Sequence, residues 1–421
     1  MNPSNASAPV TKKELFGWCC YDFANSAYTT IIITVVFQVY FANTIGEGEP
    51  RALAAWGWFI GISQILVILL SPGLGMLADL QASKKRFLVV TTLTCSLSTI
   101  ALATTGPGTV ILAGFLLILS NLAYSLGENF CASFLPELST PENCGKISGY
   151  GWSFGYCGGL VSLGLAILLL KTLGSSADTS RWIFVVTGFF FAISALPTFL
   201  FVRERKRPQT NDGWLSAFKT SWKQQIHLFG ELKQHPALLK FFIAFLCFMA
   251  GIYVIITYAS LFAGQELGFT QEELIGLFAA LQLSSAIGAF CFGFFQDKVG
   301  PKTVLIASLL LWIIVCISAA FCTSKLMFFV IGNLAGLGIG STQSTSRAVV
   351  SLLAPKSKAG EYFGFWGAFG KLAAVIGPIS FGQIASGIGM RPTIGLTTGF
   401  FLAGLLILSF LPLKLQKNAT R

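Results

Sequence analysis

Long apolar runs separated by short polar segments follow one another along nearly the whole chain. A helix that spans a membrane needs about 20 consecutive, mainly apolar residues. Turn residues and charges divide the chain into twelve runs of sufficient length, at 15–42, 53–79, 87–105, 109–135, 146–170, 181–202, 239–264, 271–296, 302–322, 325–353, 361–386 and 391–413. The pattern predicts an all-α polytopic membrane protein with twelve transmembrane helices.

The composition agrees with this prediction. Hydrophobic residues make up 54% of the 421 residues and charged residues 11%, whereas a soluble domain carries roughly 25% charged residues. The ten Cys residues form no C-x-x-C pair, and the two His residues lie in one polar segment. These spacings predict neither a disulfide framework nor a metal site, and we expect no cofactor.

The basic residues are divided unequally between the two sides of the predicted spans. With segments assigned alternately to the two sides, most of the 28 Lys and Arg residues fall on the side of the N-terminus. The other side holds only Arg51, Lys171, Arg181, Lys325 and Arg391. Because loops rich in Lys and Arg stay in the cytoplasm, both termini are predicted to be cytoplasmic. The net charge of +11 is then a signal of topology, and we expect no nucleic-acid partner.

One long polar segment divides the spans six and six. It predicts an N-terminal six-helix bundle at 1–203, a cytoplasmic linker at 204–238 and a C-terminal six-helix bundle at 239–421. In the linker, Trp214 and Phe218 share a helical face with Trp222 and Phe229. This face suits an amphipathic helix on the membrane surface, and an ordinary linker fits equally well. The short loops favour a bacterial inner membrane.

The two halves of the chain repeat each other. SPGLGMLADLQASKKR at 71–86 matches GFFQDKVGPK at 293–302, with a Gly four residues before an Asp and basic residues after it. ISGYGWSFGY at 147–156 matches YFGFWGAFGK at 362–371, and NLA at 121–123 recurs at 333–335. Two parallel six-helix repeats, with a site near the membrane midplane between them, are a recurrent plan among transporters.

The paired loops resemble the signature loop of the major facilitator superfamily, Gly-x-x-x-Asp-(Arg/Lys)-x-Gly-x-(Arg/Lys). The second copy has all five positions, at Gly293, Asp297, Lys298, Gly300 and Lys302. The first keeps Gly75, Asp79 and Lys84. Three further stretches resemble the "unknown major facilitator" family, which includes fungal autophagy-linked vacuolar amino-acid effluxers. They are WCCYDFANSAY, FLPELSTPENCGKISGYGWSFGYCGG and GSTQSTSRAVVSLLAPKSKAGEYFGFWGAFGKLAAVIGP.

The resemblance implies the major facilitator fold, alternating access, a monomer and a central cavity lined by helices 1, 4, 7 and 10. It also implies a gate in which Asp79 and Asp297 each meet the N-terminal end of a helix, here 360–363 and 146–149. A carboxylate suits such an end because free amides and the helix dipole attract it. The gating set is Asp79, Lys84, Asp297, Lys298, Lys302 and Arg347. Arg347 is predicted to pair with Asp297, and substrate binding is its alternative role.

The chain departs from the family pattern in helix 7. There the stretch FMAG places Ala250 where the family usually carries an acidic residue. Any mechanism that depends on that acid therefore does not transfer to this chain.

Polar residues form stripes on several predicted helices. At about 100° per residue, Asp22 and Asn25 share one face of helix 1, and Tyr124 and Glu128 share one face of helix 4. Charges inside a span are costly, so such residues usually serve a function. The candidate substrate-binding residues are Asp22, Asn25, Asn121, Tyr124, Glu128, Tyr156, Gln343 and Lys371.

The ionisable residues of this set have distinct expected roles. Lys371 lies about 15 Å into its helix, near the bilayer centre, where an ammonium needs an anionic partner. Asp22 and Glu128 lie about 10 Å from the inner ends of their spans and are competing candidates for proton coupling. Each has a structural alternative, since Asp22 can brace helix 1 and Glu128 can pair with a neighbour.

The sequence therefore predicts a secondary-active transporter for a small polar or zwitterionic solute, such as an amino acid. The resemblance favours efflux, with proton coupling through Asp22 or Glu128 as a further hypothesis. The alternatives are an exporter of organic anions or drugs, and a membrane sensor that binds a solute without moving it. No catalytic constellation is present in the sequence, so an enzyme is not expected.

Overall fold

The computed structural model describes residues 9–174, 176–205, 230 and 232–411. Within this part, twelve helical segments are long and apolar enough to cross a membrane, and no strand is present. They cover Lys12–Ile45, Ala55–Leu80, Lys84–Thr104, Val110–Leu138, Cys144–Leu173, Ala177–Phe201, Pro236–Leu267, Glu273–Val299, Pro301–Ala320, Lys325–Leu353, Lys356–Ile388 and Met390–Ser409. Each overlaps one predicted run, so the prediction of an all-α protein with twelve spans is confirmed.

The chain forms two compact units. Unit 1 contains the described residues of Met1–Leu138, Phe154–Lys223 and Ser357–Gly367. Unit 2 contains those of Ser139–Ser153, Gln224–Lys356 and Ala368–Arg421. The predicted division at 1–203, 204–238 and 239–421 stays a prediction, and the aromatic face of the linker lies outside the described residues.

Two long helices contribute residues to both units, α7 (Cys144–Leu173) and α15 (Ala359–Ile388). The other elements of unit 1 are α1 (Lys12–Tyr28), η2 (Thr29–Val35), α2 (Phe37–Tyr40), η3 (Phe41–Ile45), α3 (Pro50–Leu80), α4 (Lys84–Ala101), η4 (Leu102–Thr104), α5 (Val110–Ala132), α6 (Leu135–Leu138), α8 (Ala177–Ser194) and α9 (Leu196–Phe201). Unit 2 holds α11 (Pro236–Leu267), α12 (Gln271–Val299), α13 (Pro301–Ala320), α14 (Lys325–Leu353), α16 (Met390–Leu396) and α17 (Thr398–Ser409). A short turn, η5 (Lys356–Lys358), precedes α15.

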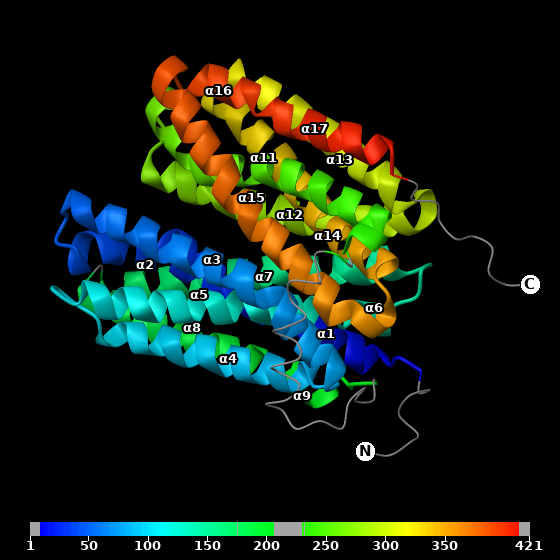
Figure 1. The fold of residues 1–421 in the computed structure, drawn as a ribbon. Helices are drawn as coiled ribbons and strands as arrows, with labels where there is room; N and C mark the ends of the chain where they lie inside the picture. The colour runs from blue at the N-terminus through cyan, green and yellow to red at the C-terminus, as the bar shows by residue number, and fades with distance from the viewer. Residues whose placement is uncertain (1–8, 175, 206–229, 231, 412–421) are drawn as a thin grey trace, which may run out of the picture. The chain divides into compact units, whose positions relative to one another are not determined.

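In unit 1, α5 lies against both α3 and α4, and α8 lies against α4 and α1 (Figure 1). Helix α4 has a hydroxyl-rich buried face, on which Thr92 and Ser98 donate hydrogen bonds to carbonyl oxygens of their own helix at 2.7 and 2.6 Å. Its exposed face is apolar, with Val90 61% and Leu97 63% exposed. This arrangement suits a helix in lipid, where apolar side chains face outward and polar groups are satisfied within the protein.

In unit 2, α14 packs along α12 and α13, while α17 packs along α11 and α13. Trp312 of α13 stacks on Phe401 of α17 at 5.4 Å between ring centroids and donates its indole N–H to Thr342 of α14 at 3.2 Å. Ser308 and Ser341 add a hydroxyl pair at 2.8 Å between α13 and α14. Trp312 thereby connects α13 with both α14 and α17.

The first span is not one regular α-helix. It contains two π-helical stretches, η2 and η3, in which Val36 N–H donates to Ile31 O and Gly46 N–H to Phe41 O, both at 2.9 Å. The Thr34 hydroxyl donates to the Thr29 carbonyl oxygen at 2.9 Å and supports the wider turn. The apolar pattern alone predicts a plain helix here, because periodicity does not distinguish one inserted residue.

Candidate functional site

Helices α1 and α7 of unit 1 approach each other at Asp22. The residue lies on α1, is 8% exposed, and its carbonyl oxygen accepts a hydrogen bond from the Ser26 hydroxyl at 2.8 Å. Helix α7 approaches at Gly155, where a Cβ would lie 3.3 Å from the Asp22 carbonyl oxygen. Tyr156 follows directly and is 9% exposed. Glycine suits this position, because a Cβ would make a tight contact with α1.

Helix α5 contributes the aromatic side of this region. Tyr124 stacks on Tyr28 of α1 at 5.2 Å between centroids, and the Tyr28 hydroxyl lies 2.8 Å from that of Ser120. Asn25 is 5% exposed, and Glu128 is half-buried on α5. The predicted residues of unit 1 therefore lie on three helices, of which α1 contacts α7 at Asp22 and α5 at Tyr28.

Asn121 has a definite packing partner. Its amide donates a hydrogen bond to Ser63 of α3 at 2.5 Å, and two turns later Asn129 donates to Ser71 of α3 at 2.6 Å. In unit 2, Asn333 of α14 accepts a hydrogen bond from Ser284 of α12. The NLA repeat therefore marks equivalent helix contacts in the two halves. This geometry favours a role in helix packing for Asn121, although its predicted substrate contact is not tested.

Lys371 and Gln343 lie in unit 2 and are half-buried. Beside Lys371, Phe369 stacks on Phe242 of α11 at 5.2 Å. Further along α15, a Cβ at Gly377 would overlap the Ala250 carbonyl oxygen. The position where the family usually carries an acid is therefore filled by a fully buried alanine in a tight contact between α11 and α15.

The first signature loop contacts the start of α15, and both lie in unit 1. The Glu361 backbone N–H donates to Asp79 Oδ2 at 3.0 Å, and a Cβ at Gly75 would overlap the Gly360 carbonyl. Asp79 is 4% exposed. The first amides of a helix have no partner within it, so a carboxylate there satisfies one of them and meets the positive end of the helix dipole.

The second signature loop repeats this contact within unit 2. Asp297 accepts hydrogen bonds from the backbone N–H groups of Gly145 at 2.8 Å and Lys146 at 2.9 Å, in the first turn of α7. Both contacts involve the helix ends that the resemblance implied. Their roles in gating stay predictions.

Arg347 reaches the same end of α7 from α14. Its guanidinium donates to the Ser148 hydroxyl at 3.2 Å and to the Ser148 carbonyl oxygen at 2.8 Å, and it lies 5.2 Å from the Trp152 ring centroid. It is 2% exposed. Arg347 and Asp297 therefore hold consecutive turns of one helix. Ser148 and Trp152 were not singled out in the sequence.

The lysines of the two signature loops differ in their contacts. Lys302 donates to the carbonyl oxygens of Ser409 at 2.7 Å and Leu411 at 2.9 Å, at the end of α17, while Lys298 is exposed. In the first loop, Lys85 makes the corresponding contact, to the Val202 carbonyl oxygen at 2.9 Å. Lys84 is instead fully buried, with its ammonium 3.4 Å from Asp79 and 2.9 Å from Glu137.

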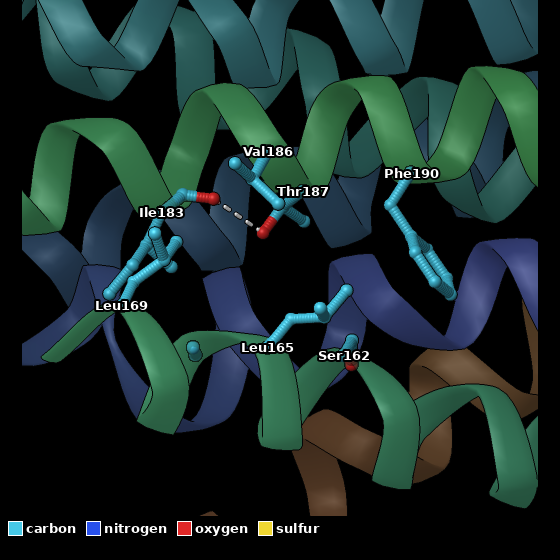
Figure 2. Close-up of a pocket in the computed structure, with 8 residues that line it drawn as sticks. Ser162, Leu165, Leu169, Ile183, Val186, Thr187 and Phe190 are labelled. Atoms are coloured by element: carbon cyan, nitrogen blue, oxygen red, sulfur yellow. Dashed lines mark hydrogen bonds between the residues drawn. The ribbon is translucent and has the colours of Figure 1, made fainter. Parts of the chain in front are cut away.

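Two cavities lie apart from these residues. One, between α7 and α8 in unit 1, is about 10 Å³ and is lined by Ser162, Leu165 and Thr187 among others (Figure 2). That volume holds about one water molecule, so it does not suit a solute. The other, in unit 2, is about 50 Å³ and is lined by apolar side chains of α11, α12 and α14 together with Tyr258 and Ser260.

Comparison with known proteins gives consistent matches. The family model described as "Vacuole effluxer Atg22 like" matches residues 57–420. The MFS-type transporter YxiO of Bacillus subtilis is 27% identical over 416 residues, covering 96% of this chain and 95% of that protein. Autophagy-related protein 22 of Yarrowia lipolytica is 24% identical over 334 residues, covering 71% of this chain and 54% of that protein.

Among solved structures, the human organic anion transporter MFSD10 (TETRAN) superposes with a TM-score of 0.75 at 14% identity, covering 94% of this chain and 99% of that one. At this identity the match concerns the fold alone. It confirms the predicted major facilitator architecture.

Proposed function

We propose a specific transport function from the premise that this chain belongs to the family described as vacuole effluxer Atg22 like, a family of major facilitator transporters. The protein exports a small polar or zwitterionic solute, such as an amino acid or a related metabolite. It works by alternating access, and a proton gradient drives uphill transport.

The observation that carries this proposal is the matched pair of contacts at the two signature loops. Asp79 holds an amide of α15, and Asp297 holds two amides of α7. The first contact consists of one charge-assisted hydrogen bond and the second of two, each bond contributing on the order of 1.5–3 kcal/mol. Contacts of that strength are strong enough to hold one state and weak enough to be exchanged for another during transport. Two equivalent contacts, one in each repeat, suit an alternating-access cycle.

The charges inside the spans support the choice of solute. Unit 1 offers the carboxylate of Asp22 and that of Glu128, and unit 2 offers the ammonium of Lys371. A zwitterionic solute carries a group for each kind of charge, an ammonium for the carboxylates and a carboxylate for Lys371. The family's description as an effluxer supports export.

Export of an organic anion or a drug is the second candidate. The apolar cavity of about 50 Å³ in unit 2 favours it, because an apolar solute group fits such a lining. The solved structure of similar fold is described as an organic anion transporter. In this alternative, the anion binds Lys371 and does not require the acidic residues of unit 1.

Flux into vesicles separates these functions. Purified protein is reconstituted into liposomes and offered labelled amino acids, dipeptides, organic anions and cationic dyes, with and without an imposed pH gradient. Saturable uptake of zwitterions supports the proposal, and uptake of anions or dyes alone supports the second candidate. Binding of a zwitterion without flux would identify a sensor and overturn the transport proposal.

A further inference from the structure

A short segment directly after span 6 is fixed to the start of two other helices of unit 1. We call Val202–Arg205 the post-span segment. The Arg205 guanidinium binds Glu14 of α1 at 2.6 and 2.8 Å, and the Arg203 N–H donates to the same carboxylate at 3.1 Å. The Lys85 ammonium donates to the Val202 carbonyl oxygen at 2.9 Å. Three of the four residues of the segment are therefore held by α1 and α4.

Glu204, the remaining residue of the segment, caps α4. Its Oε1 accepts the backbone N–H of Lys84 at 2.7 Å. Ser83, which directly precedes α4, makes no side-chain capping bond. The unpartnered first-turn amides of α4 therefore depend on a carboxyl group from a distant part of the chain. Release of the segment would expose these amides.

The cations around Glu204 are shared with other acids. The Lys84 ammonium contacts Asp79 and Glu137 of α6, and the Lys85 ammonium donates to the Val202 carbonyl oxygen while its charge attracts both Glu204 and Glu14. The other basic group of the segment that is close by, Arg205, is paired with Glu14, and Arg203 is exposed. Glu137 is a repelling neighbour. The carboxyl group of Glu204 thus lies among acids whose basic partners are already shared.

Burial raises the pKa of Glu204 from its usual value near 4.5 to about 7, and Glu137 adds to the rise. The amides of Lys84 and Lys85 and the charge of Lys84 lower the pKa by less. The charged form of Glu204 is thus disfavoured in the packed segment, whereas water around a released segment would favour it.

We propose that Glu204 is a proton-operated latch, which holds the post-span segment on α4 when the carboxyl group is neutral and releases it when the group is charged. The latch lies next to the Lys84–Asp79 pair, and Asp79 holds the first turn of α15. Release therefore loosens the first signature-loop contact as the pH on this side rises. The proton stays at the latch and is not the transported one, so this regulation is separate from proton coupling at Asp22 or Glu128.

The direction of the pH effect follows from the raised pKa. Stability of the latched segment is full well below pH 4.5 and is lost as the pH rises through about 7. Between pH 5.5 and 8.5, a rise in the pKa of this size lowers the ratio of latched to released segment by roughly thirtyfold. We expect the measured ratio to fall by at least tenfold.

Hydrogen–deuterium exchange of the full-length protein in lipid nanodiscs tests the latch. Protection of the amides at 83–88 and 202–205 is measured from pH 5.5 to 8.5 and corrected for intrinsic exchange. Wild-type protection should fall by at least tenfold, whereas Glu204→Gln should stay protected throughout. Glu142→Gln is the matched control, because Glu142 is exposed and should leave the wild-type profile unchanged. A flat wild-type profile, or an equal fall in Glu204→Gln, would overturn the proposal.

Glu137→Gln is a second variant, which tests the proposal even if Glu204→Gln does not fold. Glu137→Gln removes the negative neighbour, so the midpoint of the wild-type fall should move to lower pH. An unchanged midpoint would show that Glu204 is not the titrating group. Neither outcome depends on which solute is transported.

Discussion

At the scale of single residues, backbone amides at the starts of helices are partners of three acidic side chains in the described part of the chain. Asp79, Asp297 and Glu204 each accept N–H groups from the first turn of a helix. Such amides cannot be hydrated inside a packed bundle, so a carboxylate satisfies them and meets the helix dipole at once. Motif spacing reveals the acids, but it does not reveal which amides they reach.

Lys371 is predicted to bind the carboxylate of the solute. Lys371→Ala should weaken binding or raise KM by roughly tenfold to a hundredfold, since a charge-assisted hydrogen bond contributes about 1.5–3 kcal/mol. Lys371→Arg should restore only part of this loss, because a planar fork replaces a compact ammonium. Concentration-dependent uptake, normalised to protein amount, provides the measurement. Normal uptake by Lys371→Ala would leave the zwitterion hypothesis without its basic partner.

Asp22 is predicted to carry the coupled proton. Asp22→Asn should abolish uphill transport driven by a pH gradient and spare exchange of labelled for unlabelled solute, because exchange needs no net proton movement. Both activities are measured in the same vesicles. Glu128→Gln is the matched variant, and retention of the gradient response in Asp22→Asn would move the role to Glu128. Loss of both activities would indicate substrate binding or bracing of α1.

At the scale of elements, glycines set how closely the long helices approach. In unit 1, Gly360 and Gly364 of α15 meet the backbone of α3, and Gly158 of α7 meets Phe23 of α1. Lipid supplies no hydrophobic force between helices, so their association depends on such close contact. The glycine-rich strings of α7 and α15 are therefore packing surfaces.

Gly158 and Gly164 give a matched pair on α7. A Cβ at Gly158 would overlap the Phe23 carbonyl oxygen, whereas a Cβ at Gly164 meets nothing within 4 Å. Gly158→Ala should lower stability by about 1–3 kcal/mol through overpacking. Gly164→Ala should be neutral or stabilising by up to about 1 kcal/mol, because alanine favours a helix. Thermal unfolding in detergent compares the two, and equal melting temperatures would contradict the packing assignment.

The contact of Asp297 with α7 is predicted to act as a gate. Asp297→Asn weakens both amide hydrogen bonds, so the start of α7 should separate more often. Cys144, the first residue of α7, is 1% exposed and reports on this directly. Its labelling by a membrane-permeant maleimide should become several-fold faster in the variant.

Cys131 in unit 1 is fully buried and serves as the internal control, with an unchanged rate. Both rates come from mass spectrometry of the same sample. Unchanged labelling of Cys144 would argue against gating at this contact. Asp79→Asn tests the equivalent contact in the first repeat.

At the scale of the whole molecule, the two repeats share a plan but differ in their charges. Lys302 holds the end of the last helix of its half, and Lys85 does the same in the other half. The first repeat adds a fully buried Lys84 with Asp79 and Glu137. The structure thus assigns the capping role to Lys85, although motif spacing aligns Lys302 with Lys84.

Twelve spans predict that both termini lie on one side of the membrane, and the distribution of Lys and Arg predicts that this side is the cytoplasm. Reporter fusions test it in a bacterial host. A fluorescent protein that folds only in the cytoplasm should be bright at either terminus, and alkaline phosphatase should be active when inserted near Lys171. A dark terminal fusion or an inactive insertion would reject this topology.

The sequence by itself determined the class, the number of spans and the location of the signature loops, because hydrophobic length and glycine–acid spacing are local properties of the chain. It also located Asp22 and Lys371, since a charge in an apolar run is conspicuous, and it located Asp297 through the spacing of the signature loop. Only the tertiary structure decided which polar side chains contact each other. That Asn121 bonds Ser63, that Arg347 bonds Ser148 and that Glu204 caps α4 each depend on residues far apart in the sequence. Such pairings depend on how each helix is rotated about its axis and how closely it packs on its neighbours. The periodicity of the sequence determines neither.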